Sequence, residues 1–172
     1  MREDPVKLGI IGLGRWAKVL TRAAAKSDRL KIVAGFSRSD EKRQAYNREF
    51  GIATTPDLQT LLADQTISGV ILTVPNEQHL PVAEQAARAK KHVYTEKPIA
   101  NALEDGLRIE ALETQHGICV TVGHSARLLE GTRMIRDAID SGELGREMDK
   151  LRRTRSYQPV LSDIRSIAPT GW

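Results

Sequence analysis

Short apolar runs alternate with amphipathic stretches along the first 122 residues of the chain. The runs are rich in valine, isoleucine and leucine, which predicts buried strands of a parallel sheet. The stretches between them repeat apolar residues at helical spacing, which predicts helices. The predicted strands are 6–11, 30–36, 52–54, 67–74, 92–95 and 118–122. The predicted helices are 15–26, 40–50, 56–62, one through 82–87 and one that follows Asn101.

The helix after Asn101 has its own boundary signals. Asn101 and Glu104 have the spacing of a capping box, and Gly117 is placed to end the helix. Leu103, Leu107 and Ala111 recur on one face, which predicts that this face is buried.

Strands and helices alternate without a hairpin signal, and this order requires right-handed crossovers. The sequence therefore predicts an α/β fold, a doubly wound parallel sheet with helices on both faces, over residues 1–124. After Gly123 the pattern changes to a helix through 128–139 and an alternating, charged stretch at 147–157. Residues 125–172 are thus expected to begin an α+β second domain that the chain does not complete.

Composition fits a globular protein and excludes several classes. Of 172 residues, 40% are hydrophobic and 28% charged. No apolar run approaches the ~20 residues of a membrane helix, and the polar start argues against a secretory signal. The single cysteine, Cys119, lies in an apolar segment, so we expect it to be buried in a protein of the reducing cytoplasm.

Two further partner classes are set aside on the same grounds. The four histidines and one cysteine show no metal-ligand spacing. The net charge of +4 includes a basic stretch at 146–155. Because only Tyr157 supplies an aromatic ring there, we interpret the stretch as a solvated strand face and expect no nucleic acid.

Gly12-Leu13-Gly14-Arg15-Trp16-Ala17 follows the first predicted strand and opens the first helix. Gly12 permits a tight turn, Gly14 lets the backbone approach a pyrophosphate, and Ala17 keeps the helix close to the sheet. The N–H groups of the first turn would then face the phosphates. We therefore predict a dinucleotide-binding Rossmann domain. The predicted contacts here are Gly12, Leu13, Gly14, Arg15 and Trp16.

The end of the second strand distinguishes NAD from NADP, because an NAD site usually has Asp or Glu there to bind the ribose hydroxyls. This chain has Ser37 and Arg38 instead, and no carboxylate before Asp40. The serine hydroxyl can donate a hydrogen bond, and the planar guanidinium can face a 2′-phosphate. NADP is the predicted cofactor, with NAD as the alternative if Arg38 is only a solvated loop residue.

Polar residues also follow the central strand, at the edge where ligands of such sheets bind. Thr73, Pro75 and Asn76 are predicted cofactor contacts, since an asparagine amide can bond a ribose or the nicotinamide. His79 is a candidate contact too, but a capping role at the next helix is equally open.

Glu96-Lys97-Pro98 ends the fifth predicted strand. Oxidation of an alcohol by hydride transfer needs a group that accepts the hydroxyl proton or polarises the oxygen, and a lysine can do either. Pro98 restricts the conformation of Lys97, and Glu96 could orient its ammonium group. Lys97 is the predicted catalytic residue; the alternative is a surface lysine.

These motifs resemble the N-terminal half of the Gfo/Idh/MocA family of oxidoreductases. The glycine run, Val74-Pro75-Asn76-Glu77-Gln78-His79 and the Glu-Lys-Pro segment match family motifs in family order. Gly123-His124-Ser125-Ala126-Arg127 and Ser141-Gly142-Glu143-Leu144-Gly145 are similar to two later ones. One departure is Lys90, which stands where the family usually has glycine.

The resemblance implies roles beyond those argued from the residues. It places Lys97 near the nicotinamide and substrate, Glu96 against the cofactor, and His124 and Arg127 close to the substrate pocket. It implies that the Lys97–Pro98 peptide is often cis. It also implies a large second domain with an acid/base histidine, which this chain stops before.

We therefore expect an NAD(P)-dependent oxidoreductase that acts on a CH–OH group of a small sugar, polyol or related substrate. A cofactor-binding module or an NAD(P)-sensing regulator without turnover is the alternative. We expect no membrane partner, and we expect a homo-oligomer because an uncompleted second domain would leave strand edges and apolar surface open.

Overall fold

The computed structural model describes residues 4–143. The chain divides after Gly123 into two compact units. The first unit runs through β1 (Val6–Ile11), α1 (Arg15–Ala24), β2 (Leu30–Phe36), α2 (Asp40–Phe50), β3 (Ala53–Thr55), α3 (Leu58–Ala63), β4 (Gly69–Leu72), η1 (Asn76–Gln78), α4 (His79–Arg88), β5 (His92–Thr95), α5 (Leu103–His116) and β6 (Val120–Val122). The second contains η2 (Ser125–Leu128) and α6 (Glu130–Asp140).

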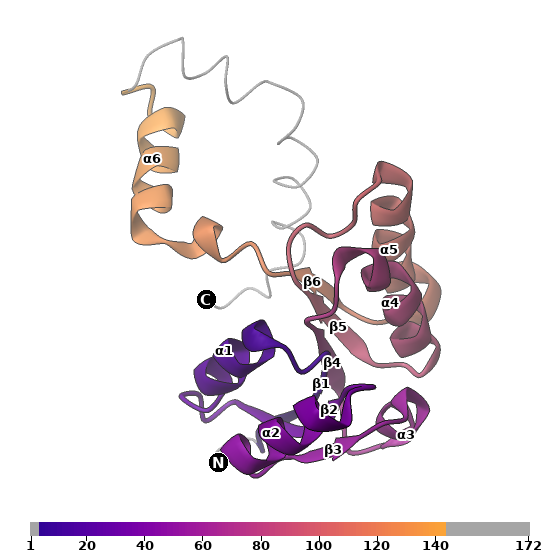
Figure 1. Cartoon of the computed structure of the whole chain (residues 1–172). Coiled ribbons are helices and arrows are strands. Elements are labelled where there is room, and N and C mark those ends of the chain that lie inside the picture. The colour runs from indigo at the N-terminus through magenta and orange to yellow at the C-terminus, as the bar shows by residue number, and fades with distance from the viewer. Residues whose placement is uncertain (1–3, 144–172) are drawn as a thin grey trace. The chain divides into compact units, whose positions relative to one another are not determined.

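The strands form one sheet in the order β3-β2-β1-β4-β5-β6, and every neighbouring pair is parallel. One apolar core joins the sheet to α3, α4 and α5, and a second joins it to α1 and α2. Figure 1 shows these helices on opposite faces of the sheet. The predicted doubly wound α/β fold is therefore confirmed. The change of strand order between β1 and β4 is the point where ligands of such sheets bind.

Several elements have the predicted bounds, namely β1, β2, α2 and β5. The helix α2 shows why, since both of its ends carry local signals. The Ser39 side chain accepts a hydrogen bond from the Lys42 N–H, and Gly51 ends the helix in the left-handed conformation with φ 66°. The strand predicted at 67–74 is shorter at both ends, as β4 covers Gly69–Leu72.

The prediction for α5 is wrong in its cap and its buried face. Ala102 precedes the helix, and no side chain caps it. Leu103 is 80% exposed and Leu107 is 54% exposed, whereas Ile109 and Leu112 are buried. The helix packs on α4 through the face that carries Ile109 and Leu112. In the sequence, the leucines on the opposite face gave the stronger apolar pattern.

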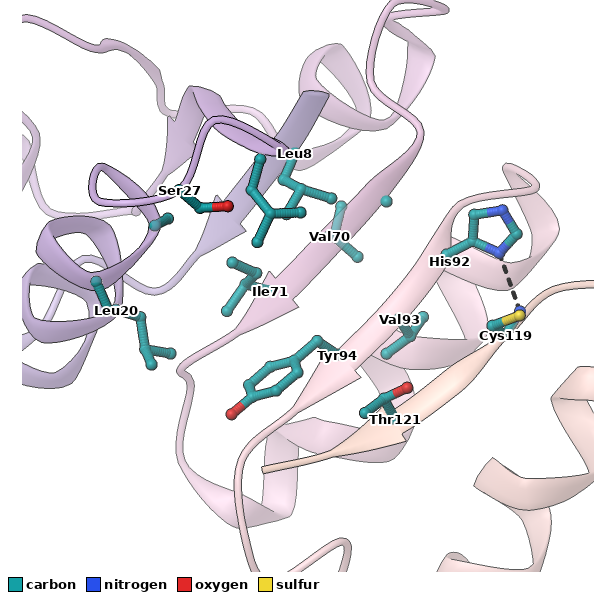
Figure 2. A pocket seen from close by; sticks show the side chains of 14 residues that line it. Leu8, Leu20, Ser27, Val70, Ile71, His92, Val93, Tyr94, Cys119 and Thr121 are labelled. Carbon is teal, nitrogen blue, oxygen red and sulfur yellow. Dashed lines mark hydrogen bonds between the residues drawn. The ribbon is translucent and has the colours of Figure 1, made fainter. Parts of the chain in front are cut away.

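An apolar hollow of about 450 Å³ lies over β4, β5 and β6, next to α1. Leu8, Ile71 and Tyr94 line it (Figure 2). Cys119 also lines it and is exposed, so the prediction of a buried cysteine is wrong. Its backbone N–H donates to Nδ1 of His92 at 3.0 Å, the dashed line in Figure 2.

Two other expectations concern membrane-spanning helices and the stretch after residue 143. Among the helices within residues 4–143, none is both long and apolar enough to cross a membrane. The strand predicted at 147–157 lies outside the described residues, as does the basic stretch.

Candidate functional site

The glycine turn between β1 and α1 has two glycines with opposite surroundings. Gly12 has φ 96°, and a Cβ there would stand 2.9 Å from the carbonyl oxygen of Thr73. Gly14 is the N-cap of α1, and a Cβ there would meet nothing within 4 Å. No side chain caps α1 and no acidic residue lies in its first turn. The helix therefore presents free N–H groups to open space, a setting suited to an anion.

Thr73 holds this turn from the neighbouring strand. Its hydroxyl donates to the carbonyl oxygens of Gly12 at 2.6 Å and Ile11 at 3.2 Å. Predicted as a cofactor contact, Thr73 thus has its hydroxyl proton engaged by the backbone. Beside it, Leu13 and Ala17 are buried, whereas Arg15 and Trp16 are exposed.

The end of β2 carries the two residues predicted to choose the cofactor. Ser37 is buried, and its Oγ accepts a hydrogen bond from the Ser39 N–H at 3.3 Å. Arg38 is exposed. Arg43 fixes this loop, because its Nη1 donates to the carbonyl oxygens of Ser37 at 2.7 Å and Arg38 at 3.1 Å.

The nearest carboxylate, Asp40, is already engaged. It accepts hydrogen bonds from Arg43 at 2.8 Å and from Gln44 at 2.7 Å, both from its own helix. A cavity of about 330 Å³ lies between α1 and α2, and Gly14, Arg15, Lys18 and Lys42 are among its lining residues. Sequence reasoning missed Arg43 and Lys42, although both follow the β2 loop within one helical turn.

The loop after β4 holds the next predicted contacts. Asn76 is partly buried in η1, and Pro75 is exposed, with its carbonyl oxygen accepting the Gln78 N–H at 2.8 Å. His79 is fully buried. Its Nε2 lies 3.3 Å from the carbonyl oxygen of Val74, and its Nδ1 lies 3.1 Å and 3.2 Å from those of Pro98 and Ile99. Both ring nitrogens thus face backbone carbonyl oxygens.

The Glu-Lys-Pro segment follows β5. The Lys97–Pro98 peptide is cis, as expected. Glu96 does not orient Lys97, because its Oε1 accepts a hydrogen bond from the Tyr94 hydroxyl at 3.2 Å, and the described ion pairs do not join it to Lys97. Lys97 itself is exposed.

Tyr94 is a residue that sequence reasoning missed. Burial and the negative charge of Glu96 raise the pKa of Tyr94 to about 12. A Cβ at Gly123 would overlap the Tyr94 hydroxyl and stand 3.0 Å from Oε1 of Glu96. Glycine at position 123 thus leaves room for the pair.

Register places the first unit's candidates at one edge of the sheet. Ile11 pairs with Leu72, and Leu72 pairs with Thr95. The segments that follow these strand ends carry the glycine turn, Thr73 and Lys97. His124 and Arg127 belong to the second unit, where the Arg127 N–H donates to the His124 carbonyl at 3.0 Å.

Residues 6–124 match the family described as "Oxidoreductase family, NAD-binding Rossmann fold". The chain therefore belongs to the Gfo/Idh/MocA family of oxidoreductases, which its motifs predicted. Among curated relatives, 1,5-anhydro-D-fructose reductase of Ensifer adhaerens is 32% identical over 139 residues, 80% of this chain and 42% of the relative. Inositol 2-dehydrogenase of Salmonella typhimurium is 31% identical over 147 residues, 83% of this chain and 44% of the relative.

Solved structures agree on the fold. A protein of Desulfitobacterium hafniense is 40% identical, with a TM-score of 0.79 over 84% of this chain and 42% of its own. The scyllo-inositol dehydrogenase of Lactobacillus casei, solved with NAD(H) and scyllo-inositol, is 28% identical, with a TM-score of 0.75 over 82% of this chain and 42% of its own. This chain thus spans less than half the length of these relatives.

Proposed function

We propose that the protein is an NAD(P)-dependent oxidoreductase, and that residues 1–124 bind the cofactor while residues 125–172 begin a substrate and oligomerisation domain. Hydride would move to or from a hydroxyl or carbonyl carbon of a sugar, polyol or related compound. The observation that carries the proposal is the register of Ile11, Leu72 and Thr95, which sets the open N-terminus of α1 and the Lys97 segment at one sheet edge.

The residues around Gly14 fit a dinucleotide pyrophosphate. The free space where a Cβ would lie and the uncapped N-terminus of α1 allow the N–H groups to bind phosphate oxygens. Thr73 keeps Gly12 and the turn in place through its hydroxyl. Pro75 and Asn76, from the adjacent loop, are proposed to contact the ribose or nicotinamide.

NADP is the proposed preference, with NAD as the alternative. Asp40 is bonded to Arg43 and Gln44, which removes the nearest carboxylate from binding a ribose diol. Arg43 also fixes the backbone of Ser37 and Arg38, so the loop presents a cation where an adenosine 2′-phosphate would lie. The cavity beside Gly14 adds Arg15 and Lys42.

Lys97 is the proposed catalytic residue. When bound, the nicotinamide ring supplies the chemistry of hydride acceptance and donation. In oxidation the substrate C–H bond breaks with its electron pair leaving as hydride, and the hydroxyl proton passes to the Lys97 amine, so that a carbonyl remains. We propose that Glu96, which is bonded to Tyr94, contacts the cofactor. We propose that His124 and Arg127 contact the substrate.

One specific observation favours a second candidate, a cofactor-binding module or NAD(P)-responsive regulator without turnover. Lys97 is exposed, and the ion pairs among residues 4–143 do not include it. A site without turnover requires no arrangement of further groups around this amine. A cytoplasmic location is proposed from the single cysteine and the polar start of the chain.

Calorimetric titration with NADPH and NADH, followed by turnover assays with sugars and polyols, tests the proposal. We expect NADPH to bind more tightly, Arg38→Ala to remove the difference, and Arg48→Ala, an exposed arginine on α2, to preserve it. We expect Lys97→Ala to abolish turnover without loss of binding, with Lys31→Ala as the matched control. Binding without turnover supports the second candidate, and absence of binding to either nucleotide overturns both.

A further inference from the structure

His79 joins two loops that the sequence separates. It is the first residue of α4, yet its Nε2 reaches back to the carbonyl oxygen of Val74, five residues earlier. Its Nδ1 faces the carbonyl oxygens of Pro98 and Ile99, which follow Lys97 directly. One imidazole ring thus spans the loops after β4 and β5, the neighbouring strands on the far side of the switch point.

The surroundings of the His79 ring are consistent with a structural role between these two loops. The residue has no exposed surface, so the ring meets neither solvent nor a ligand in the open cleft. The ring nitrogens face only backbone carbonyl oxygens, which can only accept, and a neutral ring donates from one nitrogen. The shorter distances, and two of the three acceptors, lie on the Nδ1 side, so we assign the proton to Nδ1. Removal of the ring would take away the donor for the carbonyl oxygens of Pro98 and Ile99, and the segment that carries them would be free to shift.

The Lys97 segment is therefore held on both sides. On the strand side Tyr94 bonds Glu96, and on the far side His79 bonds Pro98 and Ile99. Lys97 lies between these anchors and is itself exposed, so its position depends on them and not on contacts of its own ammonium group.

We propose that His79 is a positioning residue, which fixes the Lys97 amine because its Nδ1–H fastens the backbone just beyond Lys97 to the start of α4. This inference rests on the proposed function, because it takes the Lys97 amine to lie beside bound nicotinamide. A positioning role depends on the individual ring nitrogens. A packing role would depend only on the shape of the ring.

Three variants separate these roles. His79→Asn places an amide N–H close to the position of Nδ1, and so can keep the bond to the Lys97 segment. His79→Gln places its N–H nearer to Nε2, on the Val74 side, and so loses the bond to the Lys97 segment. His79→Leu keeps apolar bulk and has no N–H in its side chain. Tyr46→Phe, which removes a buried hydrogen bond in the other core cluster, is the control for stability alone.

The readout is the rate at which Lys97 is reductively methylated, measured by peptide mass spectrometry with and without saturating NADPH, together with the calorimetric Kd and the Tm. In the unchanged chain we expect NADPH to slow methylation of Lys97 about tenfold, with exposed Lys31 unaffected, because the nicotinamide covers a well-placed amine. The His79→Asn and Tyr46→Phe variants should retain this protection. The His79→Gln and His79→Leu variants should lose it although NADPH still binds.

Equal protection of Lys97 in all three His79 variants would overturn the positioning role. A loss of protection that follows the fall in Tm, and that is the same in His79→Asn and His79→Gln, would also overturn it. If His79→Leu does not fold, the comparison of Asn with Gln still decides. Failure of the proposed function looks different, because NADPH would then not bind, or would not protect Lys97, in the unchanged chain.

Discussion

Gly12 packs directly on Thr73 across the boundary between β1 and β4. A Cβ at Gly12 would stand 2.9 Å from the Thr73 carbonyl oxygen, while the Thr73 hydroxyl donates to the Gly12 carbonyl at 2.6 Å. The turn that begins α1 is thus locked to the strand on the other side of the switch point. Gly14, two residues later, has no such neighbour.

This contrast predicts different consequences for two alanine substitutions. Gly12→Ala should lower the free energy of unfolding by about 2 kcal/mol, because φ 96° and the carbonyl both oppose a side chain. Gly14→Ala should leave the free energy of unfolding within about 1 kcal/mol, because its backbone is extended and its surroundings are open. Gly14→Ala should nevertheless weaken NADPH binding, since its methyl group takes the phosphate's space. Urea unfolding and calorimetry check the pair, and a Gly14→Ala chain that binds NADPH normally would contradict it.

Thr95 offers a prediction about an unused hydrogen-bonding group. It is fully buried, and its hydroxyl has no hydrogen-bond partner among the described residues. Thr95→Val keeps the shape and removes the polar group, so it should raise the free energy of unfolding by about 1 kcal/mol. Thr21→Val is the matched control, because the Thr21 hydroxyl bonds Ala17 and Tyr46, and it should be destabilised by a similar amount. Destabilisation of both variants would show that the Thr95 hydroxyl has a partner in solution.

Lys90 is in the left-handed region with φ 59°, at the position where the family usually has glycine. Its Nζ donates to the carbonyl oxygen of His116, the last residue of α5. Lys90→Ala should destabilise the protein because it loses this bond and keeps the unfavourable backbone. Lys90→Gly should be about 1 kcal/mol more stable than Lys90→Ala, as measured by thermal and urea unfolding. Equal stability of the two variants would mean that the helix end relaxes.

Tyr94 predicts a loss of stability at alkaline pH. Its pKa is about 12 in the folded protein, against an ordinary value of 10.0. The unfolded chain therefore releases this proton at lower pH than the folded chain does. The contribution of Tyr94 is fully present below pH 10 and is lost as the pH rises through 12. Urea unfolding at pH 9 and pH 11 should show a smaller decline for Tyr94→Phe than for the unchanged chain. An identical decline would mean that the tyrosine titrates normally.

The sequence pattern predicted the features that depend on neighbouring residues, namely strand bounds and the glycine turn. The apolar runs at 6–11, 30–36 and 92–95 became strands with those bounds, and each contributes buried side chains to the core. The glycine turn was predictable because Gly12 and Gly14 carry backbone requirements that few other residues meet. The alternation of strands and helices predicted parallel strands with helices between them, whereas the order of the strands is known from the structure.

Partners distant in sequence were not predictable in this way. His79 bonds Pro98, 19 residues away, and Thr73 bonds Gly12, 61 residues away. Glu96 was paired with its neighbour Lys97 because opposite charges attract, but strand geometry instead brings it to Tyr94. The exposure of Cys119 depends on how far the helices extend over the sheet, which its apolar neighbours do not reveal.

Within residues 4–143, the sheet ends on each side in a strand of three residues, β3 (Ala53–Thr55) and β6 (Val120–Val122). Such a brief ladder gives an incoming chain little backbone to extend, which protects the protein from polymerising edge to edge. Mutations that lengthen β3 or β6 would therefore be expected to promote fibrous aggregation.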